Sequence, residues 1–262
     1  MDQSTISNEE TKETAYLEKI DNFIIKEYSK DQVLLHTLEA DTYYSFKNSP
    51  VQLLEVEVKT FNEFQQQGVV LKSNRAEMLK SGEMFFNGQV KIQSITGISH
   101  ELDTESLIVL SDKGQIKSNK EVTYLGEDVR IVAEGMEMSI DSDTMYLSGD
   151  VKILEDSGIT INTKNLYISQ NLGEKIYKSK EATVYHSKNT IVNSEDGIDI
   201  DMNLQLINLL GEVEVMSGPG GSLKSSNVEI DQSNDGEVLK SNSSSHFKSN
   251  TVDIKAKKMH YD

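Results

Sequence analysis

Apolar and polar residues alternate along most of the chain. In residues 53–60 (LLEVEVKT), Leu54, Val56 and Val58 alternate with charged residues. The same alternation recurs as GDVKI, GIDIDM, GEVEV and TVDI at positions 149–153, 197–202, 211–215 and 251–254. Because successive side chains of a strand point to opposite faces, a period of two predicts half-buried antiparallel strands.

Turn-forming residues separate these segments, whereas helical patterning is weak. Asp112-Lys113-Gly114 and Gly218-Pro219-Gly220-Gly221 are typical turn sequences between strand-like segments. The best helical candidate is Glu9–Tyr28, but its second half is equally typical of a strand. We favour a hairpin that runs from Phe23–Tyr28 into Val33–Ala40, and we predict an all-β protein.

The chain also repeats itself. Gly88, Gly149 and Gly211 each open the pattern Gly-x-Val-x-Ile/Val, at spacings of 61 and 62 residues. A second motif keeps the same spacing, as Ile116-Lys117-Ser118, Tyr177-Lys178-Ser179 and Leu239-Lys240-Ser241. A period of this kind indicates a stack of similar units.

A shorter unit lies inside each repeat: an apolar residue, any residue, then a small one, followed by alternating apolar positions. It occurs as Leu38-Glu39-Ala40, Leu71-Lys72-Ser73, Leu102-Asp103-Thr104, Ile161-Asn162-Thr163, Leu223-Lys224-Ser225 and Ile254-Lys255-Ala256. One such strand cannot bury its apolar face alone, so neighbouring strands must supply the core. No linker separates the copies, which predicts one continuous array.

Composition narrows the possible functions. The chain has 262 residues, with 26 Lys and Arg against 43 Asp and Glu, and a formal net charge of -17. This charge disfavours binding to nucleic acid or to an anionic membrane surface, since both require clustered cations. Cysteine is absent, which excludes disulfides and thiolate chemistry. We expect residues 1–19 to form a polar tail without the apolar segment of a signal peptide.

Motifs for catalysis or metal binding are not persuasive. Residues 231–236 (DQSNDG) imitate the start of a calcium loop, but Asn242 stands where the loop needs a glutamate. The carboxylate pairs Asp141/Asp143 and Asp199/Asp201 fit the solvated face of strands better than a glycosidase site. The five histidines are scattered. We therefore predict that the protein is not an enzyme and has no cofactor and no metal site.

Several segments, in their order and spacing, match a known family. These are LLHTLEADTYY (34–44), LLEVEVKTF (53–61), GVVLKSNRAEML (68–79) and MFFNGQVKI (84–92). The chain resembles the periplasmic bridge proteins of lipopolysaccharide transport, the LptC/LptA (OstA-like) family. Residues 20–153 resemble LptC, and residues 154–262 resemble additional OstA-type repeats, as in LptA.

The resemblance implies an elongated, repetitive β-jellyroll in which two antiparallel sheets form an apolar trough. It implies that the protein binds lipopolysaccharide through the acyl chains and passes it from the inner to the outer membrane. The expected partners are the inner-membrane ABC transporter and other jellyroll bridge subunits, joined by pairing of edge strands, with head-to-tail oligomers of the chain itself. The expected location is the periplasm, with an inner-membrane anchor through an N-terminal helix that this chain does not contain.

The residues predicted to face the trough share one face of the predicted strands. They are Leu54, Val56, Val58, Met84, Phe86, Val90, Ile92, Leu107, Val109, Met136, Met138, Ile140, Met145, Leu147, Val151 and Ile153. The predicted docking edges are Phe23 and Ile25 at one end and Val252 and Ile254 at the other. The plainer alternative is that the trough-facing set fills an ordinary closed sandwich core.

Two other functions stay open from the residues alone. A structural or adhesive β-solenoid without lipid cargo would also be repetitive, although its usual coils of roughly 20–25 residues fit the observed period poorly. A carbohydrate-processing jellyroll would need an acid pair across a cleft. Binding that depends on acyl chains would distinguish the lipid carrier from both.

Overall fold

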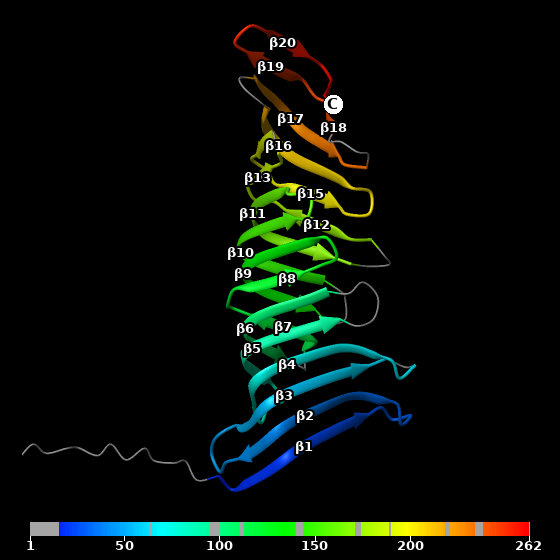
Figure 1. Cartoon of the computed structure of the whole chain (residues 1–262), viewed down its shortest axis with the longest axis vertical. Helices are drawn as coiled ribbons and strands as arrows, with labels where there is room; N and C mark the ends of the chain where they lie inside the picture. Colours follow the sequence, from blue (N-terminus) through cyan, green and yellow to red (C-terminus); the bar gives the residue numbers. More distant parts are fainter. Residues whose placement is uncertain are drawn as a thin grey trace, which may run out of the picture.

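The computed structural model describes residues 16–62, 64–94, 100–110, 113–139, 144–170, 174–188, 190–217, 221–233 and 238–261. In this part of the chain, 21 strands and no helix form one antiparallel sheet, which confirms the predicted all-β fold. The strands stack along the long axis of the molecule, from β1 at one end to β20 at the other (Figure 1).

Eleven strands are long, and the others are short. The long strands are β1 (Glu18–Tyr28), β2 (Leu34–Ser45), β3 (Val51–Phe61), β4 (Gln67–Met78), β5 (Met84–Ser94), β6 (His100–Leu110), β9 (Val129–Ser139), β10 (Thr144–Glu155), β11 (Thr160–Ser169), β16 (Leu206–Ser217) and β17 (Gly221–Asp231). The short strands are β7 (Gln115–Ser118), β8 (Val122–Leu125), β12 (Ile176–Ser179), β13 (Thr183–His186), β14 (Thr190–Ser194), β15 (Ile198–Asp201), β18 (Val238–Ser241), β19 (Ser245–Ser249), β20 (Asp253–Ala256) and β21 (Met259–Tyr261).

Strand pairing follows the chain from one end to the other. Each of β1 to β5 pairs with the next strand. Both β7 and β8 then pair with β6 on one side and with β9 on the other, so they act as one long strand broken in its middle. The couples β12/β13, β14/β15, β18/β19 and β20/β21 are broken in the same way. Position 153, the predicted end of the LptC-like part, lies inside β10, and pairing continues on both sides of it.

The repeated glycines mark the places where long strands bend. Gly88, Gly149 and Gly211 have φ angles of 80°, 76° and 76°, a region that other residues adopt only at a cost. The register of each strand shifts at this point, as in a β-bulge. The amide of Gly149 donates a hydrogen bond to Asn165 Oδ1 at 3.1 Å, and that of Gly211 donates to Asn227 Oδ1 at 2.8 Å. A bent strand can therefore line two sides of one interior.

The bends of successive strands together form a corner along the stack, and buried hydroxyl groups line its inner side. Thr104 Oγ1 lies 3.0 Å from Ser118 Oγ, and its hydroxyl donates to the Glu121 carbonyl. Two repeats further on, Ser225 Oγ lies 2.5 Å from Ser241 Oγ. These are the small polar residues of the sequence motifs. Their role follows from the broken strands, because interrupted strands leave buried backbone groups that need other hydrogen-bond partners.

The bends divide the stack into two arms that meet at the corner. We call arm one the N-terminal halves of β1, β3, β5, β10 and β16, the C-terminal halves of β2, β4, β6, β9, β11 and β17, and the strands β7, β12, β15, β18 and β21. Arm two contains the other halves, with β8, β13, β14, β19 and β20. The buried apolar side chains of both arms form a single cluster between them. We call the opening opposite the corner the mouth.

Candidate functional site

A continuous row of apolar side chains lines arm two near the mouth. Each member is the direct cross-strand partner of the next, from β1 to β20. The row consists of Ile25, Leu38, Val58, Leu71, Ile92, Leu102, Tyr124, Ile131, Ile153, Ile161, Tyr185, Val192, Val215, Leu223, Phe247 and Ile254. Two of the predicted docking residues, Ile25 and Ile254, are therefore the two ends of the same apolar row.

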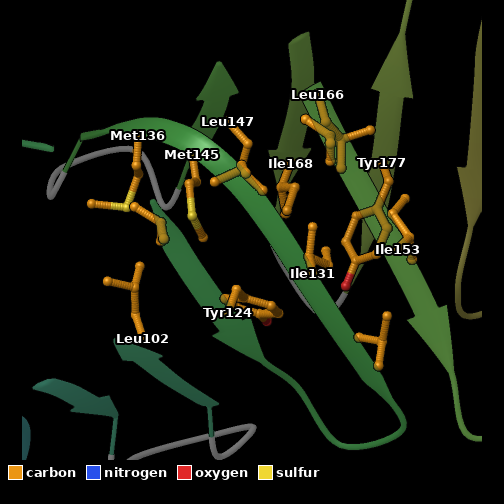
Figure 2. Packing of buried hydrophobic residues seen from close by; sticks show 14 of the residues in the cluster. Leu102, Tyr124, Ile131, Met136, Met145, Leu147, Ile153, Leu166, Ile168 and Tyr177 are labelled. Atoms are coloured by element: carbon orange, nitrogen blue, oxygen red, sulfur yellow. The ribbon is translucent and has the colours of Figure 1, made fainter. Parts of the chain in front are cut away.

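Arm one carries a matching row. Direct partners run from β3 to β18 as Val51, Met78, Met84, Val109, Ile116, Met138, Met145, Ile168, Tyr177, Ile200, Ile207, Ile230 and Leu239. Four methionines in this row give it a flexible, polarisable surface that adapts to irregular apolar groups. The two rows face the same interior, as Figure 2 shows for part of the stack.

The mouth is more open at the N-terminal end than in the middle. Val51, Val58 and Met84 are half-buried, although their strands lie inside the stack. Ile168 and Val192, at equivalent positions further along the stack, are at most 1% exposed. The arm-one row is thus more accessible over β3 to β6 than over β11 to β17, where its members are at most 2% exposed.

Most of the predicted trough-facing residues lie in the interior. Ten are buried in the core cluster: Val56, Phe86, Val90, Ile92, Leu107, Met136, Met145, Leu147, Val151 and Ile153. Val58, Met84, Val109 and Met138 pack against this cluster and stay partly exposed. Ile140 lies outside the described residues. Whether these side chains touch lipid stays a prediction.

Leu54 departs from the predicted set. It is half-buried and lies outside the core cluster, whereas its neighbour Leu53 is 1% exposed. The cause is Glu55, whose φ of 48° puts a bend between Leu53 and Val56. Both of these residues can then face inward although they are three positions apart. A strict period of two therefore selects the wrong leucine.

Other residues that line the interior lie outside the predicted set. Leu71, Leu102 and Ile161 open the short repeated unit, and all are buried. Tyr124, Tyr177 and Tyr185 are completely buried as well. The first group could have been found from the repeat itself. The tyrosines could not, because an alternating strand places a tyrosine on either face with equal ease.

Both ends of the stack present unpaired strand edges within the described residues. β1 pairs only with β2, and β20 pairs only with β19. Phe23 stacks on Tyr43 with ring centres 4.7 Å apart, whereas Ile25 is 40% exposed. At the other end, Val252 and Ile254 are 43% and 47% exposed. An edge with free N–H and C=O groups and exposed apolar side chains favours pairing with another strand.

Charged side chains lie on the outer faces, and some of them form ion pairs between neighbouring strands. Lys72 Nζ lies 3.1 Å from Glu57, and Lys178 Nζ lies 2.8 Å from Asp199. Asp231, of the calcium-like segment, is hydrogen-bonded to Lys240, which holds the pKa of that carboxyl well below its usual range. Asp199 is thus a solvent-face residue, as predicted, and Asp141 and Asp143 lie outside the described residues. Exposed pairs of this kind contribute little to stability.

A few polar groups lie between the arms. Burial raises the pKa of the Tyr124 and Tyr177 hydroxyls, because the ionised form loses its solvation. Burial lowers the pKa of Lys175, against the opposing effect of the Glu127 and Asp128 carboxylates. Tyr124 and Tyr177 lie among aliphatic side chains (Figure 2).

A cleft of about 500 Å³ remains at the mouth beside these residues. Arm two contributes Asp128, Glu155 and Asp156 to it, and arm one contributes Asp201 and Gln205. Among the described residues, no group of three or more His, Asp or Glu side chains is placed to hold a metal ion. Nor does that part of the chain contain a helix of the length and apolarity needed to cross a membrane.

Stacked antiparallel strands bent around an apolar interior define a repetitive β-jellyroll protein. The model of one family, described as "Lipopolysaccharide-assembly, LptC-related", matches residues 2–156. The match covers more than half of the chain, so the protein belongs to this family and has a role in lipopolysaccharide transport. This confirms the LptC resemblance, while the OstA-type repeats of residues 154–262 stay a prediction. A search of the curated proteins finds no match to this chain.

Proposed function

We propose that the protein is a periplasmic bridge subunit that carries lipopolysaccharide by burying its acyl chains between the two arms. The observation that carries the proposal is the pair of apolar rows, because each continues from strand to strand along the stack. Burial of one methylene group contributes about 0.8 kcal/mol, so a few acyl chains provide substantial affinity.

The net charge of -17 is compatible with an anionic lipid if the charged head group stays in solvent. The ion pairs lie on the outer faces, where salt screens them over a Debye length of about 8 Å. The acyl chains would contact only the apolar rows. We further propose that the acidic outer faces weaken adhesion of the phosphorylated sugars.

End-to-end assembly is the second half of the proposal. The exposed edge of β1 would pair with a strand of one neighbour, and the edge of β20 with a strand of the other. The apolar row from Ile25 to Ile254 would then continue into the adjoining subunit, because both of its terminal members lie at these edges. Other Lpt components, including the inner-membrane transporter, are the proposed partners.

The test of lipid carriage uses a photo-crosslinking residue, p-benzoylphenylalanine, on either face of one strand. Met84 lies in the arm-one row, and its neighbour Phe85 does not belong to the core cluster. With lipopolysaccharide, we expect a crosslinked adduct from position 84 and at least several-fold less from position 85. The adduct should be absent with fully deacylated lipopolysaccharide. Equal labelling at both positions would refute a trough, and no labelling would favour a structural repeat protein without lipid cargo.

The test of assembly is deletion of residues 251–262. We expect the truncated chain to lose head-to-tail oligomers in size-exclusion chromatography with light scattering. A matched variant, Ile254→Lys, keeps the strand but puts a charge at the end of the apolar row. Unchanged oligomer size in both variants would remove this edge from the proposal.

A further inference from the structure

Two buried tyrosines of the arm-two row are hydrogen-bonded to glutamines of arm one. Gln170 Nε2 donates to Tyr124 Oη at 2.9 Å, and Gln232 Nε2 donates to Tyr185 Oη at 3.3 Å. Both tyrosines are completely buried, and both glutamines are half-buried. We call these two contacts the cross-arm pairs.

Strand pairing does not account for these contacts. Tyr124 belongs to β8, between β6 and β9 in arm two, whereas Gln170 directly follows the arm-one end of β11. The second pair has the same arrangement, since Tyr185 lies in β13 and Gln232 directly follows β17. We call the end of each arm that lies farthest from the corner its tip. Each pair therefore joins the tips of the two arms across the mouth.

The two pairs are copies of one another. Tyr124 and Tyr185 are 61 positions apart, and Gln170 and Gln232 are 62 apart, the same spacings as those between the repeated glycines. The repeat thus places the same hydrogen bond at the same position in two consecutive units.

A buried cation lies beside the first pair. Lys175, at the start of β12 in arm one, is only 8% exposed. Its ammonium group would lie 3.6 Å from a Cβ atom placed on Gly126, in the turn that follows β8 of arm two. Tyr177, two residues further on, is completely buried.

The pairs coincide with the closed part of the trough. The mouth is open over β3 to β6, where Val51, Val58 and Met84 are half-buried. It is narrower over β11 to β17, where the members of the arm-one row are at most 2% exposed, and three of the four residues of the cross-arm pairs belong to or directly follow these strands. Acyl chains that enter near β5 would meet the first pair before reaching the later strands.

We infer that the cross-arm pairs hold the arms closed and control how far acyl chains advance along the trough. Control of the acyl chains rests on the proposed lipid function, whereas closure of the arms is a property of the protein alone. The arms exist as a closed and an open population, and lipid that binds only the open form shifts the balance. Loss of one hydrogen bond of ordinary strength shifts such a balance by roughly two- to tenfold.

The decisive variant is Tyr124→Phe/Tyr185→Phe, which removes both hydroxyls and keeps both rings. The half-buried glutamines can then turn to water. The matched control is Tyr146→Phe/Tyr167→Phe, which makes the same change at two tyrosines that are 42% exposed on neighbouring strands of arm one. Gln170→Ala/Gln232→Ala removes the same bonds from the other side and should reproduce the effect.

Closure is measured without lipid by pulsed electron-electron resonance between spin labels on the two tips. The natural chain has no cysteine, so Ser157→Cys and Leu204→Cys can be labelled uniquely. Both residues are exposed, the first at the tip of arm two and the second at the tip of arm one. We expect the long-distance population to grow by at least twofold in the decisive variant and to stay unchanged in the control. Identical distance distributions in the two variants would overturn the inference.

The consequence for lipid is measured by crosslinking at two depths. p-Benzoylphenylalanine at Met84 reports on the open part, and at Ile168 on the closed part. With lipopolysaccharide, the decisive variant should raise the yield at position 168 several-fold and leave that at 84 unchanged. No adduct at position 84 in any protein would refute lipid carriage and leave closure to be decided by the spin labels. A change in the spin-label distances with an unchanged crosslinking yield at position 168 would refute the inference that the cross-arm pairs control how far the lipid advances.

Discussion

The buried hydroxyls at the corner provide the sharpest test of how the bent strands are stabilised. Thr163 is 5% exposed, and its Oγ1 lies 3.0 Å from Ser179 Oγ and 2.8 Å from Thr183 Oγ1. Thr163→Val keeps the shape of the side chain and replaces the hydroxyl by a methyl group. The substitution therefore separates hydrogen bonding from packing.

The expected loss follows from the partners that remain. Ser179 keeps a hydrogen bond to the Lys164 carbonyl at 2.6 Å, and Thr183 keeps one to the Glu181 carbonyl at 2.9 Å. Neither the Ser179 nor the Thr183 hydroxyl is left without a partner. The free energy of unfolding should therefore fall by about 1–2 kcal/mol, which is the contribution of an ordinary hydrogen bond plus the cost of placing these hydroxyls beside a methyl group. For a chain of this length, this corresponds to a fall in melting temperature of about 2–4 °C.

The assay is equilibrium unfolding in urea, followed by circular dichroism, with calorimetry for the melting temperature. Thr123→Val is the control, because Thr123 lies on the outer face of β8, between Asp103 and Val132. That variant should change the stability by less than about 0.5 kcal/mol. If Thr163→Val is as stable as the control variant, the corner hydroxyls do not stabilise the bend.

Three further predictions concern packing, the bends and pH. Leu53→Ala should lower the free energy of unfolding by about 2–5 kcal/mol, whereas Leu54→Ala should lower it by less than about 1 kcal/mol. Equal losses of the two variants in urea unfolding would contradict the inward position of Leu53. Gly211→Ala should lower the free energy of unfolding by at least about 1–2 kcal/mol, because φ at this position is 76° and the new Cβ would lie 2.7 Å from the Cβ of Asp196. A melting temperature within about 1 °C of wild type would argue against the bend. Because burial raises the pKa of Tyr177, the stability it contributes is complete below the unfolded value of about 10 and is lost above it. Tyr177→Phe should therefore gain on wild type by up to about 1.4 kcal/mol per pH unit above pH 10. A constant difference in stability between pH 8 and 11 would contradict the raised pKa of this group.

Much of the fold was predictable from short-range patterns. The alternation around Val56 and Val151 identifies strands, because side chains of a strand alternate between its faces whatever the tertiary structure. The repeated glycines and the small polar residues that follow Leu102 and Ile161 recur in phase, and they occupy the bends and the corner in the structure. Local geometry creates these requirements, so a local pattern reveals them.

Other features were decided only when the arms came together. The bend at Glu55 reverses which neighbouring residue faces inward, and no period of two can show where such a shift occurs. The degree of closure along the mouth is equally hidden, because it depends on the distance between two arms that a local pattern does not contain. The partnership of Tyr124 with Gln170, 46 positions away, is the clearest case. The sequence determined that both residues recur with the repeat, and only the folding of each strand into two arms brought their side chains within hydrogen-bond distance.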